Sequence, residues 1–232
     1  MYPFIPLTSD SATQSLQSCF NLDIDDSKEE FGLSNLYVPG LSSTLADVLR
    51  AMRIFECTIS AYVDGLAINL DLPLVCDQRN LIMHTLMSLP PAAIAGGCMA
   101  ASSIYETTRL AAILYGIGVI FPLPSLSAPF NVLVRNLQVA FQEGEWARYR
   151  HIPHLSQLEL WVLTIRGIAS EWNMPVERSY SITLIRQLLG DKPRFPSFVE
   201  FKHTVLKPIL WLDVACDAAG ERLWNEIVLE MA

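Results

Sequence analysis

The stretch TLADVLRAMRIFECTISAYV, residues 44–63, predicts a long amphipathic helix. Its large apolar side chains recur at intervals of three and four residues, at Leu45, Val48, Leu49, Met52, Phe55, Ile59, Tyr62 and Val63. This spacing places them along one face of a helix with 3.6 residues per turn. Thr44 and Asp47 resemble a capping box at its start, and Asp64-Gly65 is a stop signal.

Further helical patterns follow this helix along the whole chain. A second helix is expected from Asp77, as its cap, to Leu89, where Pro90-Pro91 ends it. A third spans about 92–118, and the proline-rich link FPLPSLSAP at 121–129 separates it from later helices at about 129–143, 155–172, 176–190, 197–214 and 218–231. Strand signals are almost absent. The sequence therefore predicts an all-α, multi-helix, bundle-like domain over residues 41–232.

Residues 1–40 have a different composition, rich in Ser, Asp and Pro, and fit neither helical nor strand periodicity. We expect an irregular, acidic N-terminal lead-in. Its charged run DIDDSKEE, residues 23–30, has two interpretations. It is either a solvated tail or a short acidic interaction segment anchored by Leu22, Ile24 and Phe31.

Composition excludes several classes of protein. The chain has 232 residues, of which 51% are apolar and 17% charged, so it can build a large core without crosslinks. Its net charge is −8 and it has no run of Lys or Arg, so we expect no direct contact with nucleic acid. The longest apolar run, residues 110–123, is shorter than the roughly 18 residues that a membrane span needs.

The five cysteines are too far apart for a zinc site or a disulfide framework. We expect them to be small core residues in a reducing, intracellular compartment, and the start MYPFIPL does not resemble a secretion signal. His151 and His154 have a spacing that metal ligands use, but they lack an accompanying carboxylate motif and are interpreted as surface residues. No nucleophile or phosphate-binding motif occurs, so no cofactor or metal is expected.

Three segments resemble a known family when they are taken together. They are RLAAILY at 109–115, LELWVLTIRGIAS at 158–170 and ILWLDVACDAAGERLWNEI at 209–227. In this order they are similar to the fungal-specific regulatory domain that lies C-terminal to the zinc binuclear cluster of fungal transcription factors. The third segment is the most specific, and the resemblance covers about residues 45–230.

This resemblance implies a helical domain, a nuclear location (with the cytoplasm as the alternative) and control of transcription, often of a gene cluster for secondary metabolism. The family contacts DNA through six closely spaced cysteines, which this chain lacks. The chain is therefore a fragment of a longer protein, a shortened relative that acts through partners, or a domain reused for another purpose. The first hypothesis is therefore a transcriptional regulator that acts through a protein partner, such as a full-length transcription factor or a second copy in a homodimer. A small-molecule effector in the core is part of this hypothesis.

Arg166 is a departure from the family, because the family has a small residue at this point of the second segment. Two interpretations stay open. Either the helix turns Arg166 toward solvent, or the arginine is paired in the interior with an anionic ligand or with Glu106, Glu159 or Asp213.

The rival hypothesis is a helical domain reused as a small-molecule cyclase or isomerase. Its acid–base candidates are Arg166, Glu106, Asp213 and Tyr115. Trp161, Trp211 and Trp224 are candidates for a pocket or partner groove, although large aromatic residues are more often core. Asp213 and Asp217 share a helix face, and we expect Asp213 to pair near a helix end and Asp217 to cap the final helix.

Overall fold

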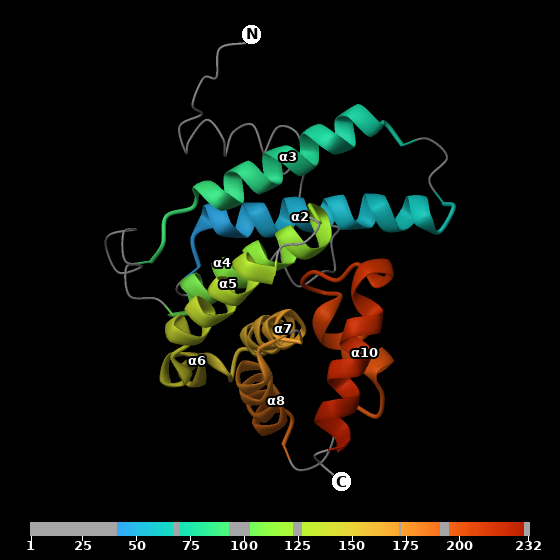
Figure 1. Cartoon of the computed structure of the whole chain (residues 1–232). Helices are drawn as coiled ribbons and strands as arrows, with labels where there is room; N and C mark the ends of the chain where they lie inside the picture. The colour runs from blue at the N-terminus through green and yellow to red at the C-terminus, as the bar shows by residue number, and fades with distance from the viewer. Residues whose placement is uncertain are drawn as a thin grey trace.

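The computed structural model describes residues 41–66, 70–92, 103–122, 127–171, 173–190 and 195–229. In these ranges every regular element is helical and no strand occurs, which confirms the all-α prediction (Figure 1). The α-helices are α2 (Ser43–Val63), α3 (Leu72–Ser88), α4 (Ser103–Tyr115), α5 (Ser127–Ala140), α6 (Glu143–Tyr149), α7 (Pro153–Ala169), α8 (Pro175–Leu189), α9 (Phe198–Phe201) and α10 (Asp213–Leu229). The predicted lead-in at residues 1–40 lies outside the described residues.

The first two described helices form an antiparallel pair, α2 against α3, at one end of the molecule (Figure 1). Helix α2 begins after Ser42, whose Oγ accepts the N–H of Leu45 at 3.1 Å. Helix α3 begins after Asp71, whose Oδ1 accepts the N–H of Leu74 at 3.2 Å. The expected caps Thr44 and Asp77 lie inside the helices, because the extended backbone that a cap needs occurs at Ser42 and Asp71 instead.

The stretch expected as one helix over 92–118 is described from Ser103 onward. Helix α4 passes into a π-helical segment, η3 (Gly116–Ile120), which closes with a hydrogen bond from the Phe121 N–H to the Gly116 carbonyl at 2.7 Å. A Cβ on Gly116 would lie 2.8 Å from the sulfur of Met83, so this glycine lets α3 approach closely. The helix therefore widens where it faces its neighbours.

Helix α7 is the centre of the domain. It contacts α4, α5, α6, α8, α10 and the π-helical segment η4 (Lys202–Leu206), and Figure 1 shows it nearly end-on among them. Every residue from Leu158 to Gly167 is buried. A helix that is apolar around most of its circumference is stable only in such a position.

The helix predicted over 197–214 is wrong as a single element. The chain forms α9, then η4, then an irregular turn, and α10 begins only at Asp213. Pro208 has no N–H to continue the helix. The N–H groups of Trp211 and Leu212 then bond to side chains of distant helices, Glu56 Oε2 at 3.0 Å and the Tyr115 hydroxyl at 2.9 Å. Tertiary hydrogen bonds thus replace helical ones here.

The cysteine prediction is confirmed for one residue and wrong for two. Cys216 on α10 is buried, whereas Cys57 on α2 and Cys76 on α3 are exposed. Helices α2 and α3 pack against the rest of the domain on one side only. Cys57 and Cys76 lie on their outer faces and are therefore exposed. Cys19 and Cys98 lie outside the described residues.

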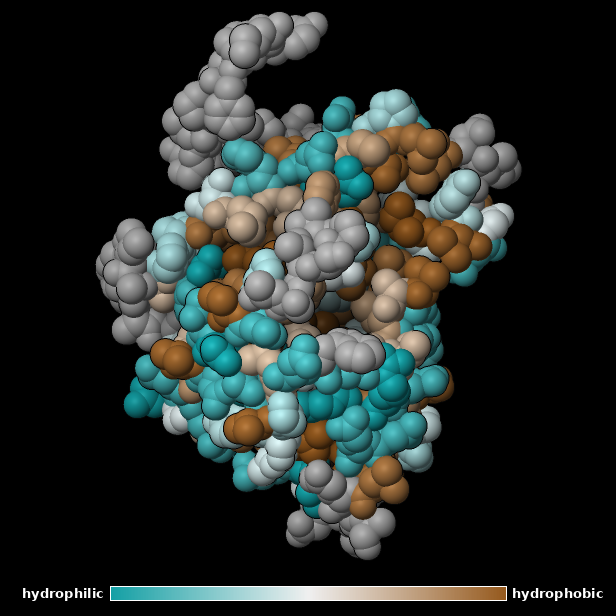
Figure 2. All heavy atoms as spheres, in the orientation of Figure 1, coloured by the Kyte–Doolittle hydropathy of each residue, from teal (hydrophilic) through white to brown (hydrophobic). Residues whose placement is uncertain are grey.

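Exposed apolar side chains gather at the turn between α2 and α3, where Figure 2 shows a cluster of hydrophobic residues on the molecular surface. They are Tyr62, Val63, Leu66, Leu72 and Leu74. We call this set the α2–α3 patch.

We expect Gly220→Ala to destabilise the domain. A Cβ there would lie 2.6 Å from Phe198 Cζ and 2.8 Å from the Trp211 ring, inside a packed core that cannot give way easily. Overpacking of this kind costs about 1–3 kcal/mol. The matched control is Gly144→Ala on α6, where no atom lies within 4 Å of the new Cβ. Urea denaturation should show a loss for the first variant and no loss for the second, and equal stabilities would contradict this account of the core.

Candidate functional site

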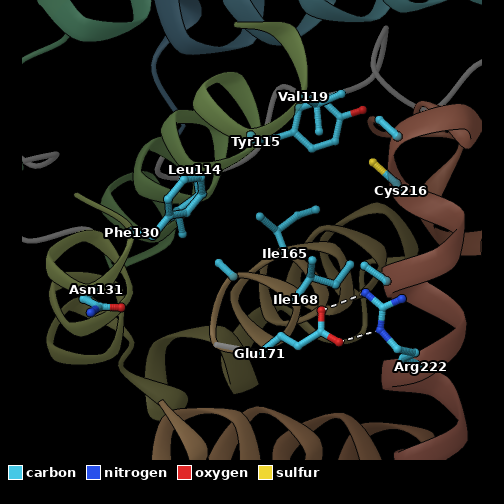
Figure 3. A pocket seen from close by; sticks show the side chains of 14 residues that line it. Leu114, Tyr115, Val119, Phe130, Asn131, Ile165, Ile168, Glu171, Cys216 and Arg222 are labelled. Carbon is cyan, nitrogen blue, oxygen red and sulfur yellow. Dashed lines mark hydrogen bonds and ion pairs between the residues drawn. The ribbon is translucent and has the colours of Figure 1, made fainter. Parts of the chain in front are cut away.

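A cavity of about 700 Å³ lies between α4, η3, α5, α7 and α10 (Figure 3). Its volume is in the range of roughly 300–1,000 Å³ that small-molecule sites occupy. The elements that enclose it come from the middle and the C-terminal end of the chain. The site is therefore a product of helix packing rather than of one local motif.

Most of the cavity wall is apolar. Helix α7 contributes Ile165 and Ile168, which Figure 3 shows pointing toward the cavity. The rest of the apolar wall is formed by Leu114, Val119, Phe130, Ala169, Ala215 and Ala219. Small side chains on α10 leave the space open, because Ala215 and Ala219 lie one turn apart and fill little of it.

The polar groups of the cavity fall into two sets. Tyr115 and Cys216 lie together on the side where α4 meets α10. Glu171 and Arg222 form an ion pair at the other side, with Arg222 Nη2 2.9 Å from Glu171 Oε2. Asn131 on α5 is the remaining polar side chain among the lining residues.

Glu56 on α2 lies behind Tyr115 and is almost completely buried, with 2% of its surface exposed. Its Oε2 accepts the Trp211 N–H, as described above, while its Oε1 has no hydrogen-bond partner among the described residues. The Tyr115 hydroxyl interacts with this carboxyl and favours its charged form. Glu56 and Tyr115 together hold the turn that leads into α10.

Burial disfavours the charged forms of all three groups at this end. It raises the pKa of Glu56 to about 7, although the Tyr115 hydroxyl, the Arg53 charge and the Trp211 N–H partly oppose the rise. Burial also raises the pKa of Cys216 to about 12 and the pKa of Tyr115 well above 10. Cys216 is therefore a thiol rather than a reactive thiolate at neutral pH, and Tyr115 is a neutral hydrogen-bond donor.

The three segments that carry the family resemblance meet at this cavity. Nine of its fourteen lining residues belong to them: Leu114 and Tyr115 to the first, Ile165, Ile168 and Ala169 to the second, and Ala215, Cys216, Ala219 and Arg222 to the third. Segments separated by up to about a hundred residues thus form one site.

The solvent-facing interpretation of Arg166 is wrong, since its exposed fraction is 0%. In the interior it forms no ion pair with Glu106, Glu159 or Asp213, and the carboxylate that acts on its charge is Glu177. Its Nη2 donates to Gln138 Oε1 at 2.9 Å, and its guanidinium lies 4.8 Å from the centroid of the Tyr180 ring. Burial lowers its pKa to about 10. It is absent from the cavity wall.

The carboxylates considered as partners of Arg166 have cations or N–H groups of their own. Glu106 bonds to Arg109 and to the Ala92 N–H, and the contact to Arg109 Nη2 is 2.7 Å. Glu159 bonds to Arg150 through both oxygens, at 2.7 and 2.9 Å. Asp213 lies 2.8 Å from Lys207 Nζ. Of the four acid–base candidates, Tyr115 alone lines the cavity.

The aspartate pair is only partly as predicted. Asp213 pairs near the start of α10 and shares Lys202 with Asp217, so the two do lie on one face. Asp217 is not a cap, because α10 begins four residues earlier. Its Oδ1 accepts the Trp211 Nε1–H at 2.8 Å instead.

The tryptophans Trp161, Trp211 and Trp224 are buried, and none is among the lining residues of the cavity. Trp161 Nε1 donates to the Leu210 carbonyl at 2.8 Å, and Trp224 stacks on Phe201 with ring centroids 4.9 Å apart. His151 is exposed and His154 is partly buried. The described part of the chain holds no group of three or more His, Cys, Asp or Glu side chains suited to a metal ion.

Sequence reasoning missed Glu56 and Arg222 as residues of this site. Glu56 occupies a helix position between apolar neighbours, Phe55 and Ile59, and a charged residue on an apolar face is a usable signal. Arg222 gave no such signal, because an arginine on an amphipathic helix is ordinary. Only the packing of α10 against α7 brings it to Glu171.

We expect the free energy of unfolding to depend on Glu56 between about pH 4.5 and about pH 7. In this window the folded chain holds a proton that the unfolded chain has lost, so stability falls as pH rises and levels off above about 7. The slope from one such group is at most about 1.4 kcal/mol per pH unit. Urea denaturation of the wild type and Glu56→Gln should show the wild type losing stability relative to the variant across this window.

Glu171→Gln is the control for this pH effect. The contribution of Glu171 to the free energy of unfolding should rise with pH, whereas that of Glu56 should fall. The ion pair with Arg222 lowers the pKa of Glu171, so its contribution is present above about pH 4.5 and is lost as pH falls through the lowered pKa. A Glu56→Gln variant that tracks the wild type at every pH would contradict the burial of an ionisable Glu56.

Arg166 and Arg178 should respond differently to replacement by Met. Arg166 Nε and Nη1 lack hydrogen-bond partners, so Arg166→Met removes a poorly compensated charge and should change stability by less than about 1 kcal/mol, or increase it. Arg178 bonds to both oxygens of Glu226 and donates to the Gly167 carbonyl at 2.8 Å. Arg178→Met should cost about 1–3 kcal/mol in denaturant titrations. The reverse order would refute this assignment of the two arginines.

Comparisons with known proteins identify no relative. No protein-family model, no curated protein and no solved structure matches the chain. No helix in the described ranges combines the length and the apolar character that crossing a membrane requires. The resemblance to the fungal regulatory domain therefore rests on the three segments that meet at the cavity.

Proposed function

We propose that this chain is the helical regulatory domain of a regulator of transcription of the fungal zinc-cluster type and acts through a protein partner. The observation that carries the proposal is the convergence of the three family-like segments on one cavity. The segments lie on α4, α7 and α10, and the cavity between these helices is suited to a small-molecule effector.

Two features support action through a partner rather than on DNA. The net charge of −8 disfavours direct binding to phosphates. The α2–α3 patch is a set of exposed apolar side chains at one end of the domain (Figure 2), and contiguous apolar surface is typical of protein interaction sites. A full-length regulator is the partner that the family resemblance implies.

Transcript levels in a strain that lacks the gene test the proposal. We expect transcripts of neighbouring or target genes to fall by about tenfold or more. A tenfold loss in affinity between the regulator and its partner corresponds to only about 1.4 kcal/mol. Re-expression of the wild type or of Gly144→Ala should restore them. Re-expression of Gly220→Val, which overpacks the core, should not. Unchanged transcripts in the deletion strain would overturn the proposal.

The rival function, a small-molecule cyclase or isomerase, is favoured by one specific observation. Glu56 has a pKa of about 7 and lies behind Tyr115, a neutral hydroxyl that lines the cavity. A carboxyl with a pKa near neutrality is suited to general acid–base catalysis. In this case Glu56 and Tyr115, rather than Arg166 or Glu106, would handle protons.

The same deletion strain separates the two functions. An enzyme predicts unchanged transcripts, one missing metabolite and an accumulated precursor. Re-expression of Glu56→Gln would then restore folded protein but not the product, whereas Arg166→Met would restore both. A regulator predicts that several transcripts and all products of the pathway fall together.

A further inference from the structure

We propose that the cavity between α4, α5, α7 and α10 binds a neutral, largely apolar small molecule. This inference rests on the proposed function, since it names the chemical class of the effector that the regulatory domain would sense. It follows from the size of the cavity, from its apolar wall and from the state of each polar group that lines it.

The size and the wall indicate a drug-sized apolar ligand. A volume of about 700 Å³ holds far more than a few ordered waters, and the wall is formed mostly by aliphatic and aromatic carbon. Few polar partners are present to hold water in place. A ligand that covers Ile165, Ile168 and Phe130 would gain roughly 25 cal/mol for each Å² of apolar surface removed from water.

The charged groups that line the cavity disfavour an ionic ligand. Glu171 and Arg222 are the two charged lining residues, and each satisfies the other through paired contacts (Figure 3). The pair carries no net charge, so an ionic ligand would lose its hydration against the apolar wall without gaining an uncompensated counter-charge. Neither sign of charge therefore finds a free partner in the wall.

The opposite end of the cavity carries neutral groups. The Tyr115 hydroxyl accepts the Leu212 N–H at 2.9 Å and interacts with the Glu56 carboxyl, so it is engaged within the protein. Cys216 is a neutral thiol beside it, and burial opposes ionisation of Glu56 behind it. A ligand anion would find no cation at this end of the cavity, and the Glu56 carboxyl behind Tyr115 would disfavour it.

The first test uses Nile red, a neutral apolar dye with a carbonyl group, and the purified full chain. We expect saturable binding with a rise and a blue shift in fluorescence. Ala219→Trp fills the cavity from α10 and should weaken binding by about tenfold or more. Ala218→Trp is the matched control, because Ala218 is adjacent to Ala219 on the same helix but is exposed and absent from the lining. It should bind like the wild type.

The second test needs no variant and separates neutral from charged ligands. 2-Undecanone, undecanoate and undecylamine have the same chain length and compete with Nile red at neutral pH. The ketone should displace the dye at a concentration about tenfold or more below that of the two ions. Equal or better displacement by undecanoate would overturn the inference.

Two results of the Nile red test would contradict the inference. No binding of Nile red to the wild type, or equal binding to Ala219→Trp and the wild type, would overturn the inference. Neither result touches the transcript experiment, which reports on regulation in the cell whether or not the cavity takes a ligand. Conversely, confirmed binding with unchanged transcripts would leave a ligand-binding domain without the proposed regulatory function.

Discussion

The full burial of α7 is the constraint on which the rest of the structure depends. Six other helical elements surround it, so each of its polar side chains must find a partner inside the protein. Glu159 bonds to Arg150, Trp161 donates to the Leu210 carbonyl, and Arg166 donates to Gln138 and lies over the Tyr180 ring. These contacts fix the positions of α5, α6, α8 and the chain before α10, because a buried polar group left unpaired costs about 1–3 kcal/mol.

A second set of buried contacts positions the C-terminal helix. Glu56 and Tyr115 accept the N–H groups of Trp211 and Leu212, and they thereby end one helical region and set the start of α10. The same two side chains form the polar end of the cavity and the region behind it. The hydrogen bonds that shape the backbone and the groups that face a ligand are thus parts of one cluster, so variants such as Glu56→Gln affect both stability and the site.

The cavity connects the proposed regulatory function with its rival. An apolar wall and an ion pair without net charge suit the reversible binding of a neutral effector. Acid–base chemistry would use the raised pKa of Glu56. The Glu56 side chain does not line the cavity and lies behind Tyr115, which does. Fold alone does not separate binding from catalysis, since function is decided by the chemistry of the site.

The sequence by itself determined the helical class, because the three- and four-residue spacing of apolar side chains over 44–63 and later segments is a local property. It also singled out Tyr115 and the three segments that line the cavity. It could not place Arg166, whose surroundings come from α5 and α8, nor end the helix near 207, where distant Glu56 and Tyr115 capture backbone N–H groups. The pairing of Glu171 with Arg222 and the raised pKa of Glu56 depend likewise on burial and on helices far apart in the chain. Only the tertiary structure decides these, because hydrogen bonding and desolvation depend on distance in space rather than on separation in sequence.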